Sequence, residues 1–361
     1  MTLYGLVDLG VAQSKDTATL NGVSASIKKS EMTSMINGPR IGFKGTEDLG
    51  GGLKANFLME YGVQPDDGAA STTMNNRQSF VGVEGGFGTV NLGRQYTAYH
   101  AHQGAFDMVN GNTNTLVGPV VCYTTRVSAS NAMLYTTPSF SGVTATVMYG
   151  FGETAKTAAG TKKNDSTGLN VKYANGPLTL GVGYDSVKNP DTATSTTVDN
   201  ASLINWSPVT GASATNKGDG LAGQNGSEKL NVYNLAASYD LGVAKIAGQY
   251  FDLKETKYAG TAGVSAKLNG FNLGVSVPMG AITLAASYSK ADVDVDAAGL
   301  SANVAEIKGH QFLATYALSK RSTVYAAYGQ DKLSTSGVIS SFGANADVKR
   351  QQYGVGLRHT F

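Results

Sequence analysis

The sequence of 361 residues contains a single cysteine, Cys122, which excludes an internal disulfide. It also lacks any run of about 18 apolar residues, which excludes a transmembrane helix. Charged residues make up only 15% of the chain, the net charge is +2 and there is no basic run, so we expect no nucleic-acid partner. Proline is scarce, with 8 residues, and there are only 4 histidines from which a catalytic or metal site could be built.

Glycine and aromatic residues are abundant instead: the chain has 46 glycines, 18 tyrosines and 12 phenylalanines. This mixture favours strands and tight turns over helices. Period-two alternation recurs from end to end. In LNVYNLAASYD, Tyr233, Leu235 and Tyr239 share one face, and Asn234 and Ser238 share the other. The segments AITLAASYSK and LKANFLMEY repeat this pattern of one oily and one polar face.

The spacers between these segments alternate between short and long. Seven short turns and eight long loops separate sixteen predicted strands, so all turns lie at one edge of the sheet and all loops at the other. Both chain ends then fall on the short-turn side. The predicted short turns are 48–52, 85–88, 139–142, 175–177, 240–242, 278–280 and 319–321, and the predicted long loops are 12–33, 62–75, 96–129, 151–167, 188–228, 257–264, 292–305 and 332–348.

This pattern is typical of an all-β fold, a sixteen-stranded antiparallel transmembrane β-barrel. A spanning sheet must close on itself, because the bilayer core offers no water to backbone amides. The segment 2–11 is the predicted first strand, and the final strand, which ends at Phe361, closes against it. The alternative is a soluble β-sandwich or a β-solenoid. A sandwich core needs Leu, Ile and Val, whereas the apolar faces here are rich in Ala, Gly and Tyr, and no fixed repeat of 20–30 residues is visible.

Several stretches resemble the trimeric general porins of Gram-negative outer membranes, especially their β-proteobacterial branch. They are TLYGLVDLGV at the start, RIGFKGTEDLGGGLKANFLME at 40–60, FVGVEGGFGTVNLGRQY at 80–96, NAMLYTTPSFSGV at 131–143 and the aromatic C-terminal strand. The resemblance covers essentially the whole chain, 1–361, as one barrel domain. It implies sixteen strands, a homotrimer in the outer membrane, contact with lipid and lipopolysaccharide, and a third loop folded into the lumen.

The loop at about 96–129 fits this last role, because it carries few charges and several apolar groups, among them Phe106, Met108 and Val109. Its apolar side should pack against the barrel wall. Leu116 and Val117 belong to the same apolar set.

The charge that sorts ions should come from arginines on or beside the strands, since arginine keeps its charge at any pH. These are Arg40, Arg77, Arg94 and Arg126. The resemblance implies that Arg40, Arg77 and Arg126 form a ladder at the constriction, with Glu60 and Asp107 facing or pairing with them. Arg94, at a strand end, is equally compatible with a structural role. Lys54 and Arg358, on polar strand faces, add to the interior charge.

Other features offer weaker signals. His100 and His102 lie two residues apart, with no third ligand at metal spacing, so a polar pair is favoured over zinc. ADVDVD (291–296) is predicted as an acidic extracellular loop. Trp206 lies in the longest loop, and Cys122 is expected to be a buried small residue. No nucleophile–base arrangement is visible, so we expect no catalytic residues and no cofactor.

The sequence therefore predicts a water-filled channel for passive diffusion of small hydrophilic solutes, with weak-to-moderate anion preference. Two alternatives stay open. One is a substrate-specific uptake channel, and the other is a surface adhesin whose long loops bind host molecules.

Overall fold

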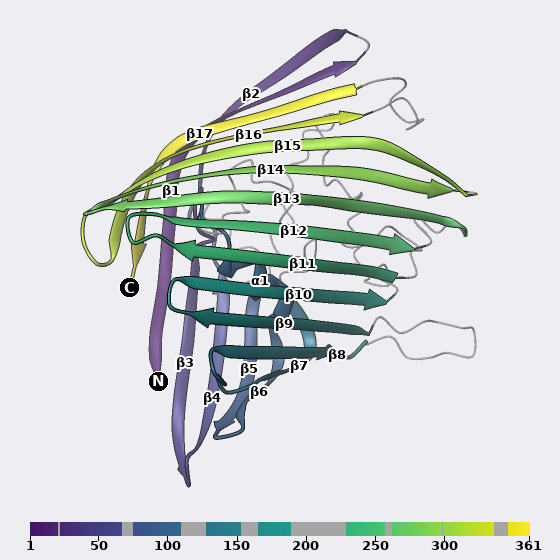
Figure 1. The fold of residues 1–361 in the computed structure, drawn as a ribbon. Coiled ribbons are helices and arrows are strands. Elements are labelled where there is room, and N and C mark those ends of the chain that lie inside the picture. The colour runs from purple at the N-terminus through teal and green to yellow at the C-terminus, as the bar shows by residue number, and fades with distance from the viewer. Residues whose placement is uncertain are drawn as a thin grey trace.

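The computed structural model describes residues 1–20, 22–66, 75–109, 128–152, 165–188, 229–256, 262–297, 299–335 and 346–361. In these parts the chain forms one helix and seventeen strands that belong to a single sheet (Figure 1). The elements are β1 (Thr2–Leu20), β2 (Val23–Thr33), β3 (Arg40–Gly50), β4 (Leu53–Gly62), β5 (Asn75–Gly85), β6 (Gly88–Tyr96), α1 (Ala98–Ala105), β7 (Ser128–Thr136), β8 (Val143–Gly150), β9 (Ser166–Asn175), β10 (Leu178–Lys188), β11 (Lys229–Asp240), β12 (Lys245–Thr256), β13 (Val264–Met279), β14 (Ile282–Ala297), β15 (Leu300–Ala317), β16 (Ser322–Thr335) and β17 (Ala346–Thr360).

The sheet closes on itself between its first and last strands. β1 pairs antiparallel with β17 from Leu6 opposite Thr360 to Leu20 opposite Ala346. At the chain ends, Gly5 and Phe361 exchange two backbone hydrogen bonds of 3.1 Å each. A closed sheet leaves no edge strand with unpaired backbone groups, which is what a segment surrounded by lipid requires. The predicted seam between the first and last strands is confirmed.

Seventeen strands fill sixteen positions around the barrel, because β2 and β3 share one. β2 pairs with the far part of β1, from Gly10 opposite Thr33 onward, and β3 pairs with its first residues, ending with Leu6 opposite Arg40. Residues 34–39 leave the sheet between them. The prediction of a sixteen-stranded barrel is therefore confirmed, with one strand interrupted near its middle.

Two of the predicted long loops are wrong. β1 continues to Leu20 and β2 begins at Val23, so most of 12–33 is a long hairpin. β14 likewise continues to Ala297 and β15 begins at Leu300, which places ADVDVD within a strand. The ends of β1 and β2 are polar on both faces, as in the cross-strand hydroxyl pair of Thr17 and Ser26 at 2.9 Å. Such strand ends show no apolar alternation. ADVDVD does alternate, but in the opposite sense to the lipid-facing strands: Val293 and Val295 pack in or against a buried cluster on the inner face, and the aspartates lie on the outer face.

Side chains alternate between the two faces of the sheet as the sequence predicted. On β11, Tyr233 and Leu235 are more than half exposed on the outer face, while Asn234 and Ser238 are buried on the inner face. The outer face is apolar around the barrel, which suits contact with lipid.

The inner face is less uniformly polar than a water-filled channel suggests. Tyr99 of α1 packs in a buried apolar cluster with inward-facing residues of β10–β16. Its strand members include Val232, Leu253, Leu268 and Val293. Water therefore does not line the whole inner wall, and the open lumen is narrower than the barrel.

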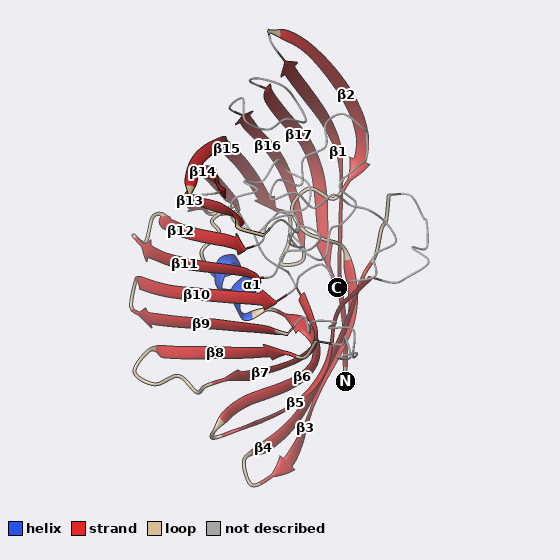
Figure 2. Ribbon diagram, turned by 90° about the vertical axis from the view of Figure 1, so that its right-hand side faces the viewer, coloured by secondary structure: helices blue, strands red, loops and turns tan. Residues whose placement is uncertain are grey.

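The helix α1 lies inside the curve of the strands (Figure 2), where it contacts β8, β9 and β10. This confirms the in-folded third loop for the described residues up to 109. Leu116, Val117, Cys122 and Arg126 lie outside the described residues, as does Trp206. No helix in the described part of the chain is long and apolar enough to cross a membrane.

Candidate pore constriction

Glu60 on β4 is the centre of a charged cluster on the inner face. Its side chain is nearly buried and accepts a hydrogen bond of 2.9 Å from Arg77 Nε. Arg40 Nε lies 3.4 Å from its other oxygen, which also accepts a hydrogen bond of 2.9 Å from the Tyr4 hydroxyl. One carboxylate thus holds two guanidinium groups, and the three charged groups together carry a formal charge of +1.

Strand register brings these side chains together. Tyr4 of β1 lies opposite Gly42 of β3, which lies opposite Glu60. A Cβ at Gly42 would lie 2.5 Å from the Tyr4 ring, so only glycine leaves the ring room to reach Glu60. The cluster therefore depends on three neighbouring strands and on one missing side chain.

Arg77 enters the cluster through a β-bulge. Glu60 pairs with Gln78, and the next residue, Tyr61, pairs with Asn76, so Arg77 is the extra residue of β5. A bulge re-aims a side chain that would otherwise follow the alternation. Arg77 Nη2 donates to the Tyr96 hydroxyl, and its guanidinium lies 5.7 Å from the centre of the Tyr96 ring. The guanidinium is therefore held between the Glu60 carboxylate and the Tyr96 side chain.

Residues 34–39, which we call the inward segment, lie against the inner face of β1 and β17. Asp8, fully buried, accepts hydrogen bonds from the backbone N–H groups of Ile36 at 3.0 Å and Asn37 at 2.5 Å, and from the Tyr325 hydroxyl. Met35 fits where Gly10 and Gly354 have no Cβ: an added one would come within 2.8 Å of its side chain at either position.

The inward segment also positions Arg40, because Arg40 Nη1 donates to the carbonyl of Gly38 at 3.2 Å. Its apolar residues Met35 and Ile36 belong to a buried cluster that includes Val109 from the constriction loop. The loop that begins with α1 thus reaches across to the inward segment.

On the opposite wall, α1 is docked through His102. Thr97 caps the helix by accepting from the backbone N–H of His100 at 3.0 Å. The His102 ring lies 2.8 Å from Asn234 Oδ1 through Nε2 and 3.2 Å from Asn170 Oδ1 through Nδ1. Gly181 and Gly183 make the close approach possible, since a Cβ on either one would lie 2.6 Å from the His102 ring. Phe106 and Tyr99, both buried, add about 1.5–3 kcal/mol each to docking.

Burial makes both histidines of the loop weak bases. Burial lowers the pKa of His102, although its bonds to Asn234 and Asn170 act in the opposite direction. Burial, together with the nearby charge of Arg77, lowers the pKa of His100 to about 4. Both rings are therefore neutral at neutral pH. No group of three His, Cys, Asp or Glu among the described residues is arranged to hold a metal ion.

Three of the predicted site residues, Arg40, Arg77 and Glu60, meet in this cluster. Asp107 lies elsewhere in the lumen, on a chamber that it shares with Arg358, and its Oδ1 accepts from the backbone N–H of Val109 at 2.9 Å. Arg126 lies outside the described residues.

Arg94 does not join the cluster, and its inclusion in the constriction needs correction. It pairs with Ser79 two residues beyond the pair of Leu92 and Val81, which are both exposed on the outer face. Its Nη1 donates to Ser130 Oγ at 2.9 Å. Strand alternation places Arg94 on the outer face, where it cannot act on ions in the lumen.

Sequence reasoning missed Tyr4, Asp8 and Tyr96, and it gave His102 no specific partner. The alternation of β1 does place Tyr4 and Asp8 on the inner face, which is a usable signal for lumen residues. Nothing in the sequence indicates which of these inner residues meet across the barrel, because their partners lie up to 317 positions away, as Tyr325 does from Asp8.

Comparisons with known proteins agree with this architecture. A family model described as Gram-negative porin matches residues 1–336. Outer membrane porin protein 32 of Delftia acidovorans is 29% identical, and an outer membrane porin protein of Bordetella pertussis is 28% identical. Each alignment covers 100% of this chain and 94% of the relative.

Solved structures show the same fold. The anion-selective porin from Comamonas acidovorans has a TM-score of 0.71 at 25% identity, covering 100% of this chain and 99% of that one. The trimer form of OmpT from Vibrio cholerae has a TM-score of 0.62 at 15% identity, with 99% of both chains covered. With the closed barrel, the in-folded loop and the family match over nearly its whole length, the chain belongs to the Gram-negative porins of the outer membrane, in the β-proteobacterial branch that its motifs indicated.

Proposed function

We propose that this porin passes small hydrophilic solutes with a preference for anions, set by Arg40 and Arg77 against Glu60. The observation that carries the proposal is the ratio of charges at the constriction: two guanidinium groups share one nearly buried carboxylate. A narrow water column between low-dielectric walls concentrates such a field, so a single net charge sorts ions. The anion-selective porin of Comamonas acidovorans, similar over its whole length, supports the same direction.

The other predicted site residues enter this proposal differently. Arg126 stays a member of the constriction on the family resemblance alone. Asp107, on the constriction loop, faces the chamber beyond the constriction and adds a negative charge there. Arg94 is left out, because it lies on the outer face.

Reversal potentials in planar bilayers test this proposal. Across a KCl gradient we expect a reversal potential whose sign shows that chloride is more permeant than potassium. The Arg77→Ala variant should give a smaller reversal potential of the same sign. Preference for cations in the unmodified protein would refute the charge assignment. A current that a single solute blocks at low concentration would favour a specific uptake channel instead, and the absence of steady conductance would favour an adhesin barrel.

We also propose that the porin carries out no catalysis. In the described constriction the charged groups are held in ion pairs and hydrogen bonds that fix them in place, which suits a static field. Assays for hydrolysis of ester and peptide substrates test this, and turnover above that of the empty membrane would contradict it.

We propose a homotrimer, as in the trimer form of OmpT, with the outer face of the terminal strands as the contact. On this face Val11 and Val355 are about 60% exposed, and a groove of about 890 Å³ is lined almost only by apolar residues of β1, β2 and β14–β17. Apolar surface of this kind suits a partner subunit or lipid equally. The mass of the protein in its detergent complex, measured by light scattering, therefore distinguishes a trimer from a monomer. A monomer mass would refute the trimer.

Lipopolysaccharide contact is proposed at the loop-side ends of β14–β17. Lys290, Lys308, Lys332 and Lys349 lie in directly opposed pairs on four consecutive strands of the outer face. Neighbouring carboxylates bind three of them: Glu306 lies 3.0 Å from Lys290 and 2.6 Å from Lys308, and Asp347 lies 3.0 Å from Lys332. This row of four lysines with neighbouring carboxylates suits lipopolysaccharide, because the lysines can bind its phosphates and the carboxylates can bind the divalent cations that bridge those phosphates. Loss of copurifying lipopolysaccharide in a variant with Lys290, Lys308 and Lys332 changed to Gln tests the contact.

A further inference from the structure

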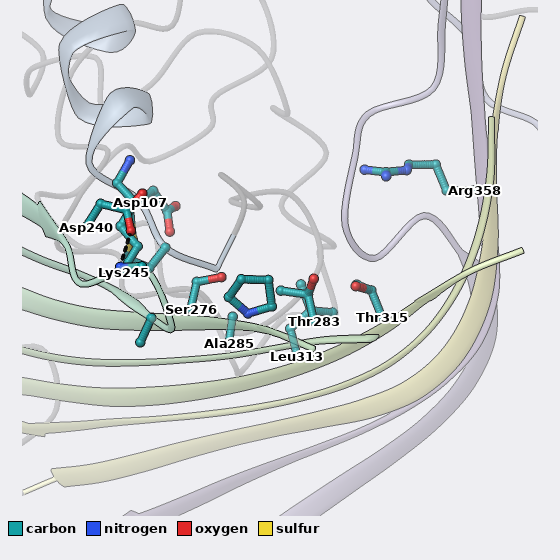
Figure 3. Close-up of a pocket in the computed structure, with 13 residues that line it drawn as sticks. Asp107, Asp240, Lys245, Ser276, Thr283, Ala285, Leu313, Thr315 and Arg358 are labelled. Atoms are coloured by element: carbon teal, nitrogen blue, oxygen red, sulfur yellow. Dashed lines mark hydrogen bonds between the residues drawn. The ribbon is translucent and has the colours of Figure 1, made fainter. Parts of the chain in front are cut away.

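A second charged chamber lies on the short-turn side of the lumen. It has a volume of about 460 Å³ and is lined by Asp107 and Met108 of the constriction loop, by residues of β12–β15 and the turn before β12, and by Arg358 of β17 (Figure 3). The turn between β11 and β12, residues 241–244, marks this end of the barrel as the one that holds both chain termini.

Arg358 is held in this chamber by neutral groups. Its Nη1 donates to Asn37 Oδ1 of the inward segment at 2.9 Å, and its Nη2 donates to Thr323 Oγ1 at 3.4 Å. None of the ion pairs among the described residues includes Arg358. A guanidinium has five N–H donors, so these two bonds fix its direction and leave both its charge and further donors in place.

The nearest acid along the strand register, Asp8, does not neutralise this charge at the chamber. Asp8 lies opposite Arg358 in the β1–β17 pairing, but its oxygens accept from Ile36, Asn37 and Tyr325. Asp8 is fully buried, whereas Arg358 is partly exposed. A solute in the chamber therefore meets the guanidinium directly.

Charges in the chamber are separated across its width. Figure 3 shows Asp107, Asp240 and Lys245 together at one end and Arg358 alone at the other. The hydroxyl groups of Ser276, Thr283 and Thr315 lie between them. Hydroxyls can donate to an oxyanion, and the field across the chamber draws an anion toward Arg358 and away from the carboxylates.

The inward segment ties this chamber to the constriction. Arg40 donates to the carbonyl of Gly38, and Arg358 donates to the side chain of the preceding residue, Asn37. Arg77 and Arg40 thus share Glu60, and the inward segment connects Arg40 to Arg358 through the neighbouring residues Gly38 and Asn37.

We propose that Arg358 forms a second anion station, a binding site for small carboxylates and phosphates in the chamber beyond the constriction. An anion that passes Arg40 and Arg77 binds next at Arg358, and the inward segment holds the two arginines in sequence. This inference rests on the proposed anion preference and adds the chemical class of the solute and a place where it binds.

Block of the KCl current by potassium citrate, added to both sides of a planar bilayer, tests the station. We expect Arg358→Gln to raise the half-blocking citrate concentration about fivefold. This is the effect in water of losing the attraction between the guanidinium and one citrate carboxylate at about 4 Å. Arg358→Lys, which keeps the charge, should restore most of the block. Asn37→Asp, which places a carboxylate against Nη1, should weaken block as Arg358→Gln does without removing the arginine.

Arg321→Gln is the matched control, because it removes the same charge from an exposed short turn at the same end of the barrel. It should leave citrate block unchanged. Equal block by citrate in the unmodified protein, Arg358→Gln and Asn37→Asp would overturn the station while leaving the anion preference standing. Cation preference in the unmodified protein would instead overturn the proposed function. If only one of the two variants, Arg358→Gln or Asn37→Asp, folds, its comparison with the unmodified protein is sufficient.

Discussion

Replacing Glu60 by Gln offers the most direct test of the charge balance at the constriction. The substitution keeps the shape of the side chain and one of its two acceptor oxygens. That oxygen can accept from Arg77, which now bonds Oε1 at 2.9 Å, while the amide group takes the place of Oε2, which now accepts from Tyr4 at 2.9 Å. It removes the one negative charge that Arg40 and Arg77 share. The formal charge of the cluster rises from +1 to +2, so anion preference should increase.

Coulomb's law gives the size of the change. A unit charge at 8 Å from a passing ion contributes about 0.5 kcal/mol in water, and screening at 0.1 M salt leaves roughly 0.2 kcal/mol. Because Glu60 repels anions and attracts cations equally, its loss shifts the permeability ratio by twice that amount, about twofold. Low-dielectric walls strengthen the field and raise the expected change to as much as about fivefold.

Reversal potentials at two salt concentrations provide the assay. At 0.1 M KCl the ratio of chloride to potassium permeability should rise by the factor above. At 1 M the Debye length is about 3 Å, so the variant and the unmodified protein should differ little. Heat-modifiable migration on gels checks that the variant barrel folds. An unchanged ratio at 0.1 M in a folded barrel would show that the cluster does not face the ion path.

Three further predictions concern the parts that hold the constriction in place. Burial lowers the pKa of His102 and that of His100 to about 4, so both histidines bind protons more readily in the undocked loop than in the docked one. Docking of the loop is therefore fully stable above pH 6.5 and weakens as the pH falls toward 4, which should appear as more frequent fluctuations of the channel current. A current that does not depend on pH would contradict this. Gly181→Val should displace α1 by pushing on His102 and Phe106, whereas Gly104→Ala on the helix itself meets open space and should leave conductance unchanged. Asp8→Asn should release the inward segment and with it Arg40, which lowers anion preference in the same bilayer assay. An Asp8→Asn channel that matched the unmodified protein would show that the segment is held by packing alone.

The strands within the apolar band could be read from the sequence residue by residue. Tyr233, Leu235 and Tyr239 face outward and Asn234 and Ser238 face inward, as predicted. The same alternation failed where strands extend past the apolar band. Both faces are polar at 12–33, and at 292–305 the apolar residues, such as Val293, face inward instead of toward lipid. It also gave no sign that residues 34–39 leave the sheet, because that departure depends on a carboxylate from another strand.

At the constriction, the family resemblance pointed to Arg40, Arg77 and Glu60, and the structure brings those three side chains together. The alternation alone could have excluded Arg94 from the predicted constriction residues, since Leu92, two residues before it, faces the lipid. Tyr4 and the partners of His102 could not be predicted, because each contact joins strands whose order around the barrel must be known first.

The sequence by itself determined the barrel: its alternation, its spacers and its aromatic ends specify a closed sheet of sixteen positions with an apolar outside, because a backbone in lipid must satisfy its own hydrogen bonds. Only the tertiary structure decided where the charge lies within that barrel. A field in a channel depends on distances across the lumen, and those distances follow from strand register, from the bulge that turns Arg77 inward, and from the glycines that let α1 and residues 34–39 approach the wall.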